Sequence, residues 1–248
     1  MDSKRAMVLR MEGTNNEEEA FLSLKRAGFE PEYVHINDLA RKRKFIDDYN
    51  LMFIPGGFSA GDYIRAGAIF AARLRPFLSD INKFIDSGRF IIGVCNGFQV
   101  LTELGLFFNG DRKIALTVNE SNRFECRFTY IRLSTKKVLS GLGNRPFQVP
   151  VAHLEGRVYC DNKTLDELIE NDQIIFRYVD NNGNYSGYPW NPNGSIMNIA
   201  GITNDSGNVI GMMPHPERVY YPYQMSGNER NSDKGTGEIF FRILYNST

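Results

Sequence analysis

Short apolar runs alternate with amphipathic stretches through the first 106 residues of the chain. A continuous apolar run is typical of a strand buried on both faces, whereas apolar residues three and four positions apart are typical of a helix. We therefore predict strands at Ala6–Met11, Glu32–Ile36, Leu51–Ile54 and Phe90–Val94, and helices at Glu17–Gly28, Asn37–Tyr49 and Ile64–Ser87. A further helix is expected after a sharp turn at Cys95, within the stretch that ends at Leu106. Strands and helices that alternate in this way form a parallel sheet with right-handed crossovers.

Local signals mark the ends of two of these helices. The turn Gly13–Asn16 can cap the acidic start of the first helix, whose Phe21, Leu22 and Leu24 are expected to face the core. Gly88 follows the long helix and is expected to end it as a C-cap glycine.

The second half of the chain has a different pattern, with β-branched and aromatic residues between Asn/Gly turns. We predict antiparallel strands added to the sheet at Lys113–Asn119, Phe124–Leu133 and Gln148–Val158, further strands at Ile174–Val179, Ile196–Ile202 and Val209–Met213, and helices at Leu165–Glu170 and Gly235–Tyr245. The fold class is therefore α/β: an open, mostly parallel sheet with flanking helices and added antiparallel strands. No repeat or linker divides the chain, so residues 1–248 are expected to form a single domain.

Composition narrows the class of protein. Lys plus Arg equals Asp plus Glu at 29 each, which gives no indication of a nucleic-acid or membrane partner. The start of the chain is polar and no apolar run is long enough to span a membrane, so we expect a cytoplasmic protein. The three cysteines have no C-x-x-C spacing, and no His/Asp/Glu spacing suggests a metal site.

The segment Gly93–Gly97 has the pattern G-x-C-x-G between a predicted strand and a predicted helix. This is the cysteine form of a nucleophile elbow, in which a tight turn presents the side chain to a cleft and the glycines let the backbones approach. The start of a helix also favours thiolate over thiol. An isolated buried cysteine is more often a packing residue, but the two glycines at a strand-to-helix junction favour a nucleophile at Cys95.

A cysteine nucleophile needs a base and an orienting group. His215 lies just beyond a predicted strand end, between Pro214 and Pro216, which restrict its backbone. Glu217 could accept a hydrogen bond from the imidazole and fix its tautomer. The sequence thus indicates a Cys95–His215–Glu217 triad.

The glycine pair at Gly56 and Gly57 follows the third strand and could direct a backbone N–H at an oxyanion, with the Asn96 N–H as its partner. An ordinary β-turn would show the same glycines. Gln99 lies one helical turn beyond Cys95 and points either into the cleft or along the helix surface.

The other candidate residues carry weaker signals. His35 is expected to be structural, and the role of His153 is undecided. Cys126 and Cys160 lie in strand-like segments and are expected to be packing residues. The basic run Arg41–Lys44 is expected on a solvated helix face.

Four segments together resemble the glutaminase subunits of phosphoribosylformylglycinamidine synthase, a family of triad-type (class I) glutamine amidotransferases of purine biosynthesis. They are GGFSAGDYIRAGAI (56–69), GVCNGFQVLTELGL (93–106), NPNGSIMNIAGI (191–202) and GMMPHPER (211–218). Weaker similarity in NESNRFECR (119–127) and VAHLEGR (151–157) extends the match to nearly the whole chain. One departure is Leu154, where the family usually has glycine, and residues 220–234 are also less typical.

The resemblance implies a flavodoxin-like amidotransferase fold, with Cys95 as the nucleophile and His215 and Glu217 completing the triad. It also implies an oxyanion hole at Gly57 and Asn96, and contacts of Gly56 and Gln99 with the substrate glutamine.

The resemblance further implies that the ammonia passes to a large synthetase subunit, which would carry ATP and Mg²⁺, and that a small accessory subunit completes the complex. No cofactor is expected on this chain. The alternatives are a redox-sensor or chaperone-like protein with a reactive cysteine, a catalytically idle scaffold subunit, and an amidotransferase that serves a different acceptor. The complete set of triad residues counts against the first two.

Overall fold

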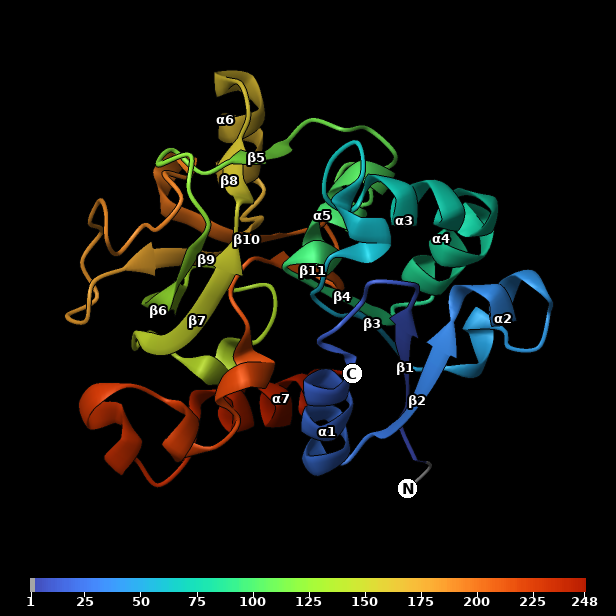
Figure 1. Ribbon diagram of the computed structural model, residues 1–248, viewed down its shortest axis with the longest axis horizontal. Helices are drawn as coiled ribbons and strands as arrows, with labels where there is room; N and C mark the ends of the chain where they lie inside the picture. The colour runs from blue at the N-terminus through green and yellow to red at the C-terminus, as the bar shows by residue number, and fades with distance from the viewer. Residues whose placement is uncertain (1–2) are drawn as a thin grey trace.

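The computed structural model describes residues 3–248 and consists of a central sheet with helices on both faces (Figure 1). The sheet has nine strands in the order β2-β1-β3-β4-β11-β10-β9-β6-β7. Its strands are β1 (Arg5–Arg10), β2 (Glu30–His35), β3 (Leu51–Ile54), β4 (Phe90–Val94), β6 (Glu125–Leu133), β7 (Phe147–His153), β9 (Ile174–Val179), β10 (Ile199–Thr203) and β11 (Val209–Met212).

Seven α-helices accompany the strands in the described part of the chain. They are α1 (Glu17–Ala27), α2 (Ile36–Ala40), α3 (Ala68–Leu74), α4 (Leu78–Asp86), α5 (Asn96–Leu104), α6 (Asn162–Glu170) and α7 (Thr236–Ser247). Helices α1 and α7 lie together on one face of the sheet, and α3, α4 and α5 lie on the other (Figure 1).

Five neighbouring strands, β2, β1, β3, β4 and β11, run parallel, and their pairings confirm the predicted βα alternation. Their order is that of the flavodoxin-like fold. Strands β3 and β11 are buried along their whole length, which explains their continuous apolar sequences. In α1, Leu24 is buried as predicted, whereas Phe21 and Leu22 are only partly buried because Ala20 and Ser23 occupy the inward positions.

The remaining four strands, β10, β9, β6 and β7, pair antiparallel, as the second half of the sequence predicts. Strand β10 begins at Ile199, three residues later than predicted, because Ile196–Asn198 form a 3₁₀ turn. The sheet joins residues from both halves of the chain without a break.

Two of the predicted additions to this sheet are wrong. The chain bends at Leu154, so the predicted strand Gln148–Val158 is divided into β7 and β8 (Glu155–Tyr159). Strand β8 leaves the main sheet and pairs antiparallel with β5 (Ala115–Val118) in a separate two-stranded sheet, which lies beside α6 (Figure 1).

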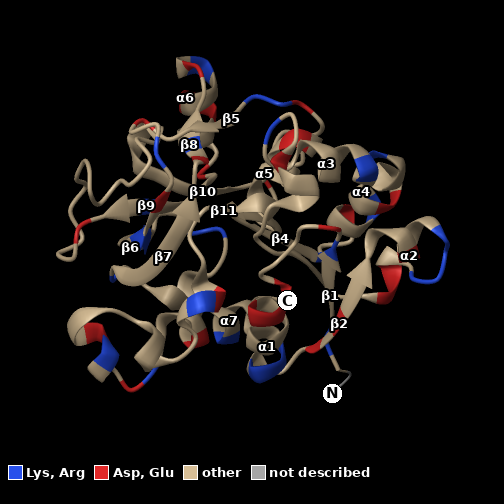
Figure 2. Cartoon of the chain, in the orientation of Figure 1, with Lys and Arg blue, Asp and Glu red and all other residues tan. Residues whose placement is uncertain are grey.

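The helix predicted at Asn37–Tyr49 is also wrong beyond Ala40. The amides of Arg43 and Lys44 both donate to the Asp38 carbonyl oxygen, which closes the helix. The Lys44 ammonium then forms an ion pair with Glu32 of β2 and draws the chain back toward the sheet. The basic run 41–44 therefore lies in a loop (Figure 2).

The long helix predicted at Ile64–Ser87 is interrupted twice. Gly67 has a left-handed backbone (φ 77°), so α3 begins only at Ala68, and a 3₁₀ turn containing Pro76 separates α3 from α4. Gly88 (φ 79°) follows α4 and ends it as predicted.

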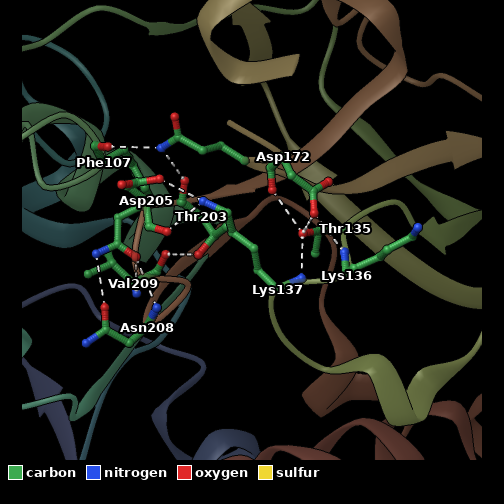
Figure 3. Close-up of polar contacts among 11 residues, drawn as sticks. Phe107, Thr135, Lys136, Lys137, Asp172, Thr203, Asp205, Asn208 and Val209 are labelled. Atoms are coloured by element: carbon green, nitrogen blue, oxygen red, sulfur yellow. Dashed lines mark hydrogen bonds and ion pairs between the residues drawn. The ribbon is translucent and has the colours of Figure 1, made fainter. Parts of the chain in front are cut away.

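A polar network holds the end of the sheet at which β11 begins (Figure 3). The Thr203 hydroxyl donates to the Val209 carbonyl oxygen at 2.8 Å, and the Asn208 side-chain amide donates to the carbonyl oxygens of Ile85 and Arg89. Thr135 and the Lys136 amide both donate to the Asp172 side chain in the same region. These bonds fix where β11 starts, and therefore which residues emerge at its other end.

Positively and negatively charged residues are interspersed along the chain (Figure 2). Within residues 3–248, no helix is both long and apolar enough to cross a membrane.

Candidate active site

Cys95 occupies the sharp turn between β4 and α5 that the elbow pattern predicts. Its backbone has the strained values φ 52° and ψ −106°. Its amide donates to the Met212 carbonyl oxygen of β11 at 2.8 Å, which ties the turn to the neighbouring strand. A methyl group added to Gly97 would lie 2.0 Å from the Ile54 carbonyl oxygen, so only glycine permits this approach of α5 to β3.

The pairing of β11 with β4 brings His215 beside this cysteine. Met212 lies opposite Val94 in the parallel register, so the residues that follow both strands emerge at the same edge of the sheet. The His215 amide is held by the Pro150 carbonyl oxygen of β7 at 2.9 Å. A methyl group on Gly56 would lie 2.7 Å from His215 Cε1 and 3.4 Å from Cys95 Cβ, so both side chains lie against this glycine.

His215 and Glu217 form a buried pair. His215 Nδ1 lies 2.6 Å from Glu217 Oε1, and each residue is 1% exposed. Since Nδ1 is engaged by the carboxylate, Nε2 is the ring nitrogen left for the thiol; this atom is buried without a hydrogen-bond partner in the described structure.

The charges around His215 favour its protonated form. Burial by itself lowers the pKa of this imidazole, but the Glu217 carboxylate and the Cys95 sulfur outweigh burial and raise the pKa to about 10.

Asn16 is a site residue that the sequence analysis missed. It was expected to help cap α1, but its side chain makes no capping hydrogen bond. Instead, Asn16 Nδ2 lies 3.2 Å from His215 Nδ1, and the Asn16 amide donates to the Gly56 carbonyl oxygen. The available signal was its position in the loop that follows the first parallel strand, at the edge of the sheet where Cys95 and His215 also lie.

The predicted oxyanion groups lie beside the nucleophile. Gly57 has a φ of 151°, and a methyl group there would lie 2.8 Å from the Asn15 nitrogen, so the position requires glycine. Asn96 is the first residue of α5, and its amide therefore has no partner within the helix. These features are compatible with an oxyanion hole at Gly57 and Asn96, which stays a prediction.

A cavity of about 200 Å³ opens beside the Cys95 side chain and is also lined by Gly57 and Gln99. Gln99 Nε2 donates to the Glu155 carbonyl oxygen at 2.5 Å, and its Oε1 accepts from Asn96 Nδ2 at 2.9 Å. The structure thus places Gln99 at the cleft, with its amide held by protein groups. Larger hollows, of about 290 to 550 Å³, are present among the described residues, and none of them includes Cys95.

The remaining histidines and cysteines differ in location. His35 is structural as predicted, since its Nδ1 accepts from the Asn37 amide at the start of α2. His153 is buried and lines the Cys95 cavity. Cys160 is a buried packing residue as predicted, but Cys126 is exposed, because it faces outward from β6. All three cysteines are free, and within residues 3–248 no group of His, Cys, Asp and Glu side chains could hold a metal ion.

Comparisons of the sequence and of the structure with known proteins agree with one another. The sequence model of the CobB/CobQ-like glutamine amidotransferase domain matches residues 3–246. Phosphoribosylformylglycinamidine synthase subunit PurQ of Archaeoglobus fulgidus is 47% identical, over 97% of this chain and 95% of its own length. The subunit of the same name from Treponema denticola is 42% identical, over 86% of this chain and 87% of its own length.

Solved structures give the same result. The structure of PurLQS from Thermotoga maritima contains a chain that is 32% identical and superposes with a TM-score of 0.76, covering 100% of both chains. A second protein of Thermotoga maritima, described as a glutamine amidotransferase, is 14% identical with a TM-score of 0.55. That match covers 88% of this chain and 77% of the other, and it shows the fold alone.

Proposed function

This chain belongs to the family of PurQ subunits of phosphoribosylformylglycinamidine synthase, glutamine amidotransferases of purine biosynthesis, and we propose that it hydrolyses glutamine with Cys95, His215 and Glu217. The observation that carries this assignment is the convergence at one sheet edge of an elbow cysteine and a buried His–Glu pair. The predicted flavodoxin-like α/β fold and the predicted family are both confirmed.

In the first half of the reaction, His215 Nε2 accepts the thiol proton, and the Cys95 thiolate attacks the side-chain amide carbon of glutamine. The Gly57 and Asn96 amides stabilise the oxyanion that forms on the amide oxygen. As the C–N bond breaks, His215 returns the proton to the departing nitrogen, which leaves as ammonia, and a glutamyl thioester remains on Cys95.

In the second half, water attacks the thioester carbon and gives a proton to His215 Nε2. The C–S bond then breaks, glutamate is released, and the proton returns to the Cys95 sulfur. Throughout both halves, Glu217 holds the Nδ1–H of His215 and stabilises the imidazolium. Gly56 makes room for the two side chains beside the substrate.

The destination of the ammonia follows from the family. Phosphoribosylformylglycinamidine synthase is a complex, and we propose that a large synthetase subunit receives the ammonia and binds the ATP and Mg²⁺, with a small accessory subunit completing the assembly. We also propose that the whole chain, residues 1–248, is one amidotransferase domain that works in the cytoplasm and carries no cofactor of its own. The sheet that joins both halves of the chain supports the single domain.

The test is glutamine-dependent ammonia release, measured with and without the synthetase subunit, for the wild-type chain and for Cys95→Ala. We expect a loss of at least about 10⁴-fold on removal of the sulfur, because no other thiol and no hydroxyl side chain lines the cavity among the described residues. Mass spectrometry after treatment with a glutamine-like alkylating agent should show the adduct on Cys95. Normal hydrolysis by Cys95→Ala inside the complex, or no labelling of Cys95 under any condition, would contradict the triad.

A further inference from the structure

Two arginines face each other across the antiparallel strands β6 and β9. Arg132 of β6 lies directly opposite Arg177 of β9, and the two strands lie side by side at the left of the view (Figure 1). The Cβ atoms of directly opposite residues are about 4.5–5.5 Å apart, so like charges at such positions destabilise a sheet. This pair is therefore costly to the fold unless another group offsets the repulsion.

No carboxylate in the described part of the chain neutralises the two arginines. Arg132 Nη1 donates to the Gly183 carbonyl oxygen at 2.9 Å and Arg177 Nη1 to the Met197 carbonyl oxygen at 2.6 Å, and among residues 3–248 neither guanidinium group forms an ion pair with a carboxylate. The Asp180 carboxylate follows Arg177 closely in the sequence, but its Oδ1 accepts from two backbone amides of its own turn at 2.9 and 2.8 Å.

Both guanidinium groups keep donors for a further partner. An arginine side chain carries five N–H groups, and the carbonyl contacts use one nitrogen of each side chain. Both side chains are half-buried. Burial and the charge of Arg132 lower the pKa of Arg177, although an arginine stays charged near neutral pH. The pair is therefore a concentrated and partly desolvated positive site.

Tyr185 holds the two guanidinium groups beside one aromatic ring. The ring centroid lies 5.1 Å from the guanidinium carbon of Arg132 and 5.7 Å from that of Arg177. The negative face of the ring attracts both cations and offsets part of their repulsion, but it carries no net charge to neutralise them. Tyr185 is 56% exposed, so the ring and the arginines beside it are within reach of a molecule in solution.

We propose that Arg132, Arg177 and Tyr185 form a binding site for a phosphate group, either free or carried by a small molecule. Near neutral pH a phosphate group carries close to two negative charges and accepts hydrogen bonds through several oxygens, which matches two adjacent guanidinium forks. Bound between the arginines, it would neutralise both charges and relieve their repulsion. Neither arginine lines the Cys95 cavity, so this site is independent of the proposed function.

The test is a calorimetric titration of the full-length chain with inorganic phosphate at pH 8, with the ionic strength held constant by sodium chloride. Glycerol 3-phosphate is the second probe, and glycerol is its uncharged counterpart. The variants are Arg132→Gln and Arg177→Gln, each of which removes one charge from the site. The matched control is Arg41→Gln, which removes the same charge from an exposed residue after α2.

The wild type should bind inorganic phosphate with a Kd of about 1 mM or below, because both guanidinium groups make charge-assisted contacts. Each site variant should weaken binding about 10- to 100-fold, whereas Arg41→Gln should change the Kd by less than about twofold. Arg132→Lys keeps the charge but not the planar fork, so its Kd should lie between those of the wild type and Arg132→Gln. Glycerol should not bind. Tighter binding of glycerol 3-phosphate than of phosphate would identify a phosphorylated small molecule as the occupant, and the reverse order would identify free phosphate.

Thermal unfolding separates this role from a purely structural one. Phosphate should raise the Tm of the wild type and of Arg41→Gln, and this rise should be lost in both site variants. If the arginines only held Tyr185 in place, the variants would lower the Tm equally with and without phosphate, which would overturn the proposal. A wild-type Kd above about 30 mM, or equal phosphate binding by the wild type and both site variants, would overturn it as well. Tighter binding of a glutamate-rich peptide than of either phosphate probe would also overturn it, in favour of an acidic protein partner.

Discussion

The two walls of the Cys95 cavity are built in contrasting ways. The elbow wall, residues 90–104, is a strand and a helix whose turn is fixed by close packing of Gly97 against β3 and by the Cys95 amide, which donates to β11. The loop wall, residues 58–66, has left-handed backbones at Ala60, Asp62 and Ile64, and exposes Tyr63 (75%) and Ile64 (85%).

The two walls also differ in how far their charged groups are buried and paired. His215 and Glu217, which face the elbow, are buried and form a close pair, so the proton between them is held in a low-dielectric site. Asp62 in the loop wall is only partly buried and has one long hydrogen bond. We infer from this comparison that the closely packed elbow wall holds the proposed reacting groups in place, whereas the exposed loop wall is the side that can adapt to a bound molecule. We therefore expect substitutions in the two walls to differ in size and in kind.

The largest effect should come from Glu217→Gln. Without the carboxylate, the Nδ1–H tautomer of His215 is no longer held and its imidazolium is no longer stabilised, so the pKa of His215 falls. We expect the rate of thioester formation, measured by single-turnover mass spectrometry, to drop by about 10³- to 10⁴-fold. The control is Glu170→Gln, at an exposed residue at the end of α6, which should leave the rate of thioester formation unchanged. An unchanged rate in Glu217→Gln would remove Glu217 from the triad.

Gly97→Ala tests the rigidity of the elbow wall. The added methyl group would lie 2.0 Å from the Ile54 carbonyl oxygen, so either α5 or β3 must move. We expect a loss of roughly 3 kcal/mol in the free energy of unfolding, measured by urea denaturation, together with loss of Cys95 labelling. Wild-type stability in this variant would mean that the elbow is looser than the contact implies. The matched control is Gly187→Ala, which adds the same methyl group where φ is not positive and no atom lies within 4 Å, and which should leave the stability nearly unchanged.

The pH dependence of kcat/KM should report on the loop wall. In the free enzyme, partial burial and then the charge of Glu155 raise the pKa of Asp62 to about 6, so its carboxylate is protonated below that pH and charged above it. Because Asp62 lines the Cys95 cavity and its charged form attracts a positively charged group there, kcat/KM for glutamine should rise about tenfold as the pH increases through about 6. Asp62→Asn should lose this limb of the profile. If the variant kept this limb of the pH profile unchanged, the limb would report the titration of a group other than Asp62.

The smallest effect should come from Ile64→Asn. A β-branched residue with φ 73° is strained by roughly 1–2 kcal/mol, and asparagine accepts this conformation more readily. Because Ile64 is exposed, little packing is lost, and we expect the free energy of unfolding to rise by about 1 kcal/mol with unchanged Cys95 labelling in the isolated chain. Destabilisation would show that Ile64 makes contacts that the loop depends on.

The sequence was informative where structure depends on neighbouring residues. The apolar runs located β3, β4 and β9, and the G-x-C-x-G pattern located the elbow, because strand burial and tight turns leave local signatures. Periodicity was misleading at 37–49 and 64–87, where Lys44 pairs with Glu32 and where Gly67 and Pro76 interrupt an otherwise helical stretch.

By itself, the sequence determined the alternation of strands and helices, the family, and the identity of the three proposed triad residues. Only the tertiary structure decided that β11 lies beside β4, which brings together residues 120 positions apart, and that Asn16, Asp62 and Glu155 share the site with them. Only the tertiary structure showed, in addition, that β5 and β8 form a sheet separate from the main one. The physical reason is that strand pairing and loop placement depend on packing between distant segments, which leaves no periodic signal in either segment alone.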